Sequence, residues 1–210
     1  LSATFTATAV NDGIIDGSQI ANIAATASGF QGTTQAITVV DRTNPTFPTG
    51  VQTLATSRPT FTWTSIPNAA TYQVYVDNVT TNQSQVINVT GVTTNSYTST
   101  IDLPIGTYNV WVRGFTSSNL VGVWSPLAVW NLRPTTTILN SGRTESNGAF
   151  SIDWSPIAGA SSYDVWVNNV TSSTSAYLRD PNVIGASLDV TNFEIGQYAV
   201  WVRARNSAGD

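Results

Sequence analysis

A repeat of about 90 residues constrains this chain more than any other feature of its sequence. The first copy contains Tyr72-Gln-Val-Tyr-Val-Asp-Asn-Val-Thr80, and the second contains Tyr163-Asp-Val-Trp-Val-Asn-Asn-Val-Thr171. A second shared block, residues 105–113, returns as residues 195–203. Both blocks place a tyrosine and two valines at every second position, which is the period of a β-strand with one buried face. One β-domain used twice in a row is the simplest interpretation.

The aromatic residues of the two copies keep the same spacing. Trp63 lies nine residues before Tyr72, and Trp154 lies nine before Tyr163. We therefore predict that each copy closes its core around a tryptophan and tyrosines on the inward faces of its strands. The predicted core aromatics are Trp63, Tyr72, Tyr108, Trp130, Trp154, Tyr163 and Tyr198.

The composition favours an all-β protein and disfavours several classes of partner. Charged residues make up 10% of the chain, against about 25% in an average domain, while threonine and the aromatics suit pleated strands. The net charge is −4 and all eight basic residues are arginine, so no basic patch that binds nucleic acid is expected. No stretch approaches the roughly 20 apolar residues of a membrane-spanning helix.

The residue types needed for most catalytic sites are missing from the sequence. Histidine and cysteine are absent, which excludes histidine-based triads, cysteine nucleophiles and zinc sites built from these ligands. The chain has two glutamates, Glu145 and Glu194, and most of its aspartates fall at predicted turns. Aspartates at turns usually accept hydrogen bonds from the backbone. We predict that the chain is not an enzyme and needs no cofactor.

The first repeat, residues 51–133, carries a set of family motifs. They are Trp63, Tyr72, Leu103-Pro-Ile-Gly-Thr-Tyr-Asn-Val-Trp-Val112, and Trp124-Ser-Pro126 before the final strand. In this order they resemble the fibronectin type III (FN3) sandwich, and the resemblance implies that Tyr108 is the tyrosine corner of that family. The expected architecture is a tandem of Ig-like, FN3-like β-sandwiches.

The second repeat, residues 134–210, departs from this pattern at its end. It stops where a counterpart of Trp124-Ser-Pro126 and a seventh strand are expected. Two explanations stay open: a longer protein continues past Asp210, or a strand from another chain completes the edge after Arg203, as in donor-strand filaments.

Residues 1–41 contain three predicted strands, at 2–10, 19–27 and 35–40. Three strands do not close a sandwich, which takes about seven. The string TATAVNDGIIDGSQIANIAATASGF…AITVVD resembles the closing strands of Calx-β-type and related Ig-like repeats of bacterial surface proteins. This resemblance implies that the first half of the domain lies upstream of Leu1. Residues 42–50, which hold two prolines, are predicted to be a semi-rigid linker.

A calcium site is one interpretation of the aspartates at the ends of these strands. The Calx-β resemblance implies that acidic loops bind Ca²⁺, with Asp12, Asp16 and Asp41 as the candidates. The ion prefers six to eight oxygen ligands, and this segment offers few carboxylates. The alternative is that the three side chains form ordinary turns with the backbone.

Strand alternation also predicts an exposed aromatic surface. If Val74 and Val76 point inward, Tyr75 points outward, and the neighbouring strand presents its own aromatic and arginine beside it. The predicted surface comprises Tyr75, Trp111 and Arg113 in the first repeat, and Trp166, Trp201 and Arg203 in the second. It is a stiffening arginine–aromatic stack, a contact surface for a neighbouring domain or subunit, or a platform for sugars.

Two functions from different classes fit these features. The first is a structural or adhesive segment of a large extracellular or cell-surface repeat protein, such as a rod, fibre, stalk or surface layer. Its partners would be neighbouring repeats or subunits of the same protein. The alternative is a carbohydrate-binding or spacer module attached to a secreted enzyme. Four matches to the N-glycosylation pattern, at Asn78, Asn82, Asn88 and Asn169, also arise by chance in a chain this rich in threonine and asparagine.

Overall fold

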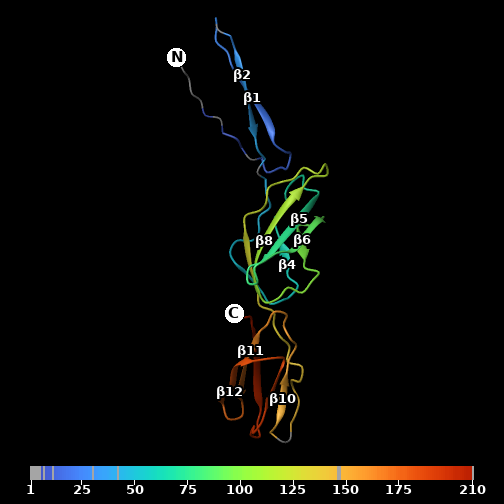
Figure 1. Cartoon of the computed structure of the whole chain (residues 1–210), viewed down its shortest axis with the longest axis vertical. Helices are drawn as coiled ribbons and strands as arrows, with labels where there is room; N and C mark the ends of the chain where they lie inside the picture. Colours follow the sequence, from blue (N-terminus) through green and yellow to red (C-terminus); the bar gives the residue numbers. More distant parts are fainter. Residues whose placement is uncertain are drawn as a thin grey trace.

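The computed structural model describes residues 6, 8–10, 12–29, 31–41, 43–145 and 148–209. Within these residues every helix-or-strand element is a β-strand, which confirms the predicted all-β class of tandem Ig-like sandwiches. Figure 1 shows a β-hairpin, a first sandwich and a second sandwich in a row along the long axis of the molecule. None of the described residues forms a helix long and apolar enough to cross a membrane.

The first sandwich consists of two sheets that face each other. The larger sheet has the order β3 (Gln52–Leu54), β9 (Ala128–Leu132), β8 (Gly106–Phe115), β5 (Thr71–Asn78) and β6 (Gln83–Val92). The smaller sheet pairs β4 (Thr60–Thr62) with β7 (Ser96–Thr98). β3 runs parallel to β9, and the other pairs are antiparallel. This is the strand order of an FN3-like sandwich.

The core of this sandwich follows from strand alternation. Tyr108, Val110 and Val112 on β8 are fully buried, while the residues between them are half-buried. Trp63 and Tyr72 are each 4% exposed, and their rings meet edge to face at 5.4 Å. Aromatic pairs of this geometry add to the stabilisation that comes from burial of apolar area.

Among the described residues, the second sandwich repeats this plan with two strands fewer, because neither β3 nor β9 has a counterpart. β10 (Phe150–Asp153) pairs with β13 (Ser187–Val190). The other sheet has the order β12 (Thr174–Val183), β11 (Ser162–Asn169) and β14 (Tyr198–Arg205). β14 corresponds to β8, but among the described residues no strand takes the place of β9 beside it. Its inward side chains Tyr198, Val200 and Val202 are accordingly half-buried.

β1 (Gln19–Ala25) and β2 (Thr33–Val39) form an antiparallel hairpin outside both sandwiches. The strand predicted at residues 2–10 falls partly outside the described residues, and residues 8–10 are not in a strand. The face expected to be inward on β1 is open, since Ala21 and Ala25 are exposed and Ile23 is half-buried. Two strands alone have no second layer with which to bury a face.

The segment predicted as a linker packs onto the first sandwich. Phe47 meets Trp63 and Trp130 edge to face, at 6.3 Å in each case. The Thr64 N–H donates to the carbonyl oxygen of Thr46 at 2.9 Å. Ring packing and backbone pairing therefore fix the path of the chain into the sandwich.

Candidate functional site

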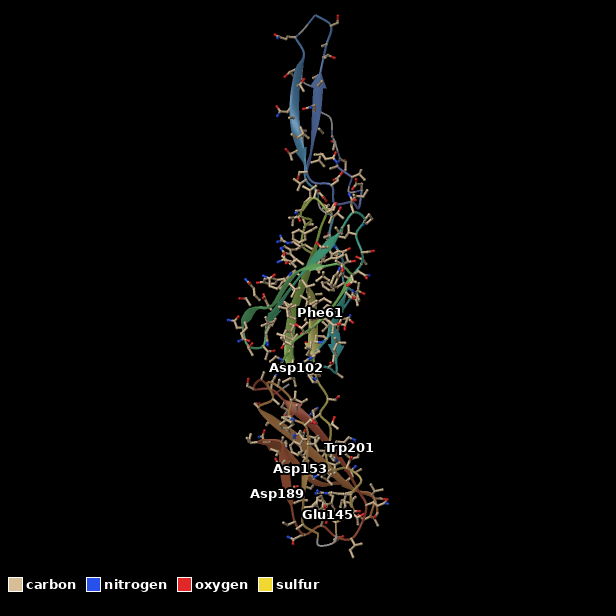
Figure 2. The ribbon with its side chains drawn as sticks, turned by 90° about the vertical axis from the view of Figure 1, so that its right-hand side faces the viewer. Phe61, Asp102, Glu145, Asp153, Asp189 and Trp201 are labelled. Carbon is tan, nitrogen blue, oxygen red and sulfur yellow. The ribbon has the colours of Figure 1, made fainter. Side chains whose placement is uncertain are left out.

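The two sandwiches meet through the turn that precedes β8. Ile105 is 3% exposed and belongs to the core cluster of the second sandwich. Its N–H donates to the carbonyl oxygen of Ala158 at 3.0 Å. A Cβ placed on Gly159 would lie 2.6 Å from the Cβ of Pro104, so this turn approaches as closely as a glycine permits. Figure 2 shows Asp102, three residues before Ile105, at the end of the first sandwich that faces the second.

A tyrosine corner holds the Ile105 turn in place. The Tyr108 hydroxyl donates to the carbonyl oxygen of Pro104 at 2.7 Å and accepts from the Asn78 side-chain amide at 3.1 Å. Burial raises the pKa of Tyr108, so the phenol stays neutral and keeps its proton as a donor. The Thr107 N–H donates to Thr80 Oγ1 at 2.9 Å. The backbone of the turn is thus fixed from two sides.

The same arrangement bears on two of the four glycosylation patterns. Asn78 and Asn169 are each 2% exposed, and their amides bind the hydroxyls of Tyr108 and Tyr198. Modification at either position would require a buried, hydrogen-bonded amide to leave its place. The patterns at these two positions are therefore explained by the tyrosine corners.

The hairpin meets the first sandwich in a corresponding way. Ile15 is fully buried and belongs to the core cluster of the first sandwich. A Cβ on Gly114 would lie 2.8 Å from Ile15 Cδ1, and one on Gly122 would lie 2.9 Å from the same atom. Glycine at both positions makes room for the isoleucine.

Ile15 and Ile105 occupy equivalent places in the two sandwiches. Gly114, beside Ile15, corresponds in the repeat to Ala204, which shares a core cluster with Ile105. We call the part of a sandwich that buries this isoleucine its docking seat. In the first sandwich the seat contains Ile66, Ala69 and Gly114, and in the second it contains the turn 157–160 and Ala204. Each sandwich therefore receives an isoleucine from the part of the chain before it.

The three aspartates considered for calcium make hydrogen bonds at turns. Asp41 accepts from the N–H groups of Asp16, Gly17 and Thr43 at 2.8 to 3.4 Å. Asp12 accepts from the Ile14 N–H at 3.0 Å, and Asp16 accepts from the Gln19 side chain at 2.5 Å. No three acidic side chains in the described ranges gather closely enough to hold a metal ion. The structure brings Asp16 and Asp41 together through the backbone and leaves Asp12 in its own turn.

Aromatic residues gather on the outer face of the large sheet of the first sandwich. Tyr75 on β5 lies directly opposite Trp111 on β8, with ring centroids 5.8 Å apart. Trp124 packs against Tyr75 at 6.0 Å, and the Arg113 guanidinium lies 4.4 Å from the Trp124 ring. Tyr75, Trp111, Trp124 and Ser125 line a depression of about 290 Å³.

Trp124 is a member of this surface that sequence reasoning missed. It lies in the loop before β9, where alternation does not predict a direction. The loop runs beside β8, because the Ser125 N–H donates to the Val112 carbonyl oxygen at 2.7 Å and Ser125 Oγ accepts from the Val112 N–H at 3.1 Å. These bonds bring Trp124 over the face. The Trp-Ser-Pro motif is the sequence feature from which the position of Trp124 on this surface could have been inferred.

The second sandwich presents a different version of the surface. Trp166 lies opposite Trp201, and the two line a depression of about 270 Å³ with Asn168. Trp201 is 54% exposed, and Figure 2 labels it on the second sandwich. The cation over the Trp166 ring is Arg179 of β12, at 4.6 Å. Arg203, expected beside the aromatics as a stacking partner, donates instead to Asp164 at 3.1 Å. A carboxylate attracts a guanidinium more strongly than an exposed ring does.

Asp164 is the most strongly perturbed carboxylate of this face. Its side chain is 6% exposed and lies 2.9 to 3.2 Å from guanidinium nitrogens of Arg179, Arg203 and Arg205. Hydrogen bonds from Arg179, and then from Arg205, lower the pKa of Asp164 to about 2 against the opposing effect of burial. The first sandwich has the neutral Gln73 at this position, bonded to Arg113 at 2.9 Å.

We expect Asp164→Asn to lower the free energy of unfolding of the second sandwich by about 1–3 kcal/mol, because three arginines lose the negative charge and one acceptor oxygen of their shared partner. The pKa of Asp164 is lower in the folded state, so the wild-type contribution is complete above the ordinary pKa of 3.8 and disappears as the pH falls toward 2. Unfolding by urea at pH 2 to 6 measures both effects. Asp189→Asn, at an exposed position of β13, is the control, and equal results for the two variants would contradict the role of Asp164.

Among known proteins, similarity to this chain is found in solved structures. No family model matches the chain, and no curated protein matches it. The crystal structure of the chicken CNTN1 FN1-FN3 domains matches over 85% of this chain and 67% of its own length, with 22% sequence identity and a TM-score of 0.33. The fold assignment rests on the strand order and pairing described above.

Proposed function

We propose that this chain is a structural segment of a larger extracellular or cell-surface repeat protein, in which sandwiches docked end to end form a stiff rod or stalk. The observation that carries the proposal is the burial of Ile105 of one sandwich in the core of the next. A tether alone leaves the orientation of two domains free, whereas a shared core fixes it. The Calx-β-like origin of residues 1–41 remains part of this proposal.

The use of the carboxylates supports a role without catalysis. Asp102 pairs with Arg58 at 3.0 Å, and Asp153 accepts from Ser187 at 2.6 Å. Asp164 is neutralised by its three arginines. These groups hold strands and loops together.

A distance measurement between the two sandwiches tests the rod. The chain contains no cysteine, so Ser84→Cys on β6 and Ser175→Cys on β12, both exposed, accept two spin labels at equivalent places. Pulsed electron paramagnetic resonance is expected to give one narrow distance distribution, because docking fixes the two sandwiches.

The additional change Ile105→Asp is expected to broaden this distribution, since a carboxylate is costly in the apolar seat. Ile195→Asp, at an exposed counterpart, is expected to leave it narrow. A broad distance distribution in the chain with native Ile105 would contradict the proposal.

The aromatic faces favour one second candidate, a carbohydrate-binding module. Tyr75 and Trp111 in one depression, and Trp166 with Trp201 in the other, offer the flat apolar surfaces on which sugar rings stack. Titration with a panel of soluble oligosaccharides, followed by tryptophan fluorescence, tests this candidate. A saturable change that Trp166→Ala/Trp201→Ala reduces would support it, and an unchanged spectrum throughout would remove it.

A further inference from the structure

The counterpart of Ile105 in the second sandwich is Ile195, and its side chain is exposed to solvent. Ile105 is 3% exposed, whereas the relative exposure of Ile195 is 104%. A single exposed isoleucine is ordinary on a protein surface. Ile195 differs because its place in the repeat is the one from which the first sandwich docks into the second.

The turn around Ile195 is held in the same way as the turn around Ile105. The Tyr198 hydroxyl donates to the carbonyl oxygen of Glu194 at 3.0 Å and accepts from the Asn169 side chain at 3.2 Å. The Gln197 N–H donates to Thr171 Oγ1 at 2.8 Å, as the Thr107 N–H does to Thr80. The second sandwich therefore presents Ile195 in the geometry in which Ile105 is buried.

We propose that Ile195 docks into the seat of a further sandwich of the same polypeptide. This inference rests on the proposed function and names the partner: a sandwich with small residues at the positions of Gly159 and Ala160 and a free carbonyl at that of Ala158. Both seats of the present chain are occupied, by Ile15 and Ile105. A second copy of the chain therefore offers no vacant seat. At both junctions of this chain the isoleucine comes from the preceding unit.

Among the described residues, no strand pairs with the outer edge of β14. In the first sandwich β9 covers the equivalent edge and leads directly into the junction, where the Arg133 N–H donates to the Leu54 carbonyl oxygen at 2.8 Å. A strand that leads from β14 to a further sandwich would cover Tyr198, Val200 and Val202 on its way. One contact of the junction differs, because Glu194 stands at the position of Pro104. The partner turn would meet a carboxylate there.

The test lengthens the chain by one further repeat, added at the position where the repeat pattern continues. Asp210 corresponds to Leu120 in the repeat, so a second copy of residues 121–210 placed after Asp210 supplies the missing strand and a further seat. The chain has no cysteine, and Ile195→Cys gives a single thiol in both the present and the extended chain. We expect the rate of its reaction with a maleimide to fall by more than about tenfold on extension.

Two matched thiols calibrate the experiment. Ile184→Cys, at a residue that is 77% exposed on the same sandwich, is expected to react at one fast rate in both chains. Ile105→Cys is expected to react slowly in both.

Three results would overturn the proposal. The first is an equal rate for Ile195→Cys in the two chains. The second is an added sandwich that stays unfolded, although the same sequence folds beside Ile105 in the present chain. A cysteine in place of the copy of Val165 would then react with the maleimide, whereas Val165 itself is fully buried. The third is self-association of the present chain that Ile195→Asp abolishes, which would assign the seat to a second copy. The spin-label distance between the existing sandwiches does not involve Ile195. That measurement therefore tests the proposed function independently of the proposal for Ile195.

Discussion

Replacing Ile105 by alanine is expected to lower the free energy of unfolding of the second sandwich by about 2–4 kcal/mol, although the residue belongs to the first. The side chain is 3% exposed among the core residues of the second sandwich, and its removal leaves a cavity at the docking seat. The loss combines the transfer free energy of the deleted methyl and methylene groups with the cost of this cavity. A residue that served only the first sandwich would not have this effect.

Guanidinium unfolding followed by tryptophan fluorescence measures the change, as a shift of the transition of the second sandwich to lower denaturant. Ile195→Ala is the matched control, because it makes the same substitution before the same glycine at an exposed position. It should change the free energy of unfolding by less than about 0.5 kcal/mol. Equal losses from the two substitutions would mean that Ile105 is not docked.

Replacing Gly159 by alanine is expected to destabilise the junction by about 2–4 kcal/mol, since two costs add. The backbone at Gly159 has φ of +76°, a conformation that costs an L-residue about 1–2 kcal/mol. The added Cβ would also lie 2.6 Å from Pro104 Cβ, which is shorter than any tolerated contact. The clash is relieved only if the two sandwiches move apart.

Gly185→Ala separates these two costs. Gly185 has φ of +90°, and a Cβ there would meet no atom within 4 Å, so this control carries backbone strain alone. We expect it to cost about 1–2 kcal/mol in the same unfolding experiment. If Gly159→Ala costs no more than Gly185→Ala, the close approach of Pro104 to the turn does not exist in solution.

The fold class could be predicted from the sequence because the side-chain pattern of both repeats has the two-residue period of a β-strand. In residues 105–113, Tyr108, Val110 and Val112 occupy every second position, and a set with this period lies on one face only when the chain is extended. The same alternation puts Tyr75 and Trp111 on one face. Their direct pairing then follows from the neighbouring positions of the two strands in this kind of sandwich.

The remaining features of the candidate site depend on tertiary contacts that a local pattern does not contain. Trp124 reaches the aromatic face through a loop, and Arg179 takes the stacking role expected of Arg203 because Asp164 holds the latter. Ile105 and Ile195 each precede a glycine in the same motif, yet one is buried and the other exposed. Ile105 has a neighbouring sandwich in contact with it and Ile195 has none among the described residues, and a local sequence pattern contains no information on such a neighbour.

Exchange of backbone amide hydrogens in the unmodified chain tests the docking of the sandwiches most directly. The Ile105 N–H donates across the junction to Ala158, whereas in the described part of the chain the Ile195 N–H has no acceptor. Measured by nuclear magnetic resonance in deuterated buffer, the Ile105 amide is expected to exchange only when the junction opens, and the Ile195 amide close to the rate of an unprotected peptide. Fast exchange at both amides would show that the sandwiches are joined only by their connecting chain.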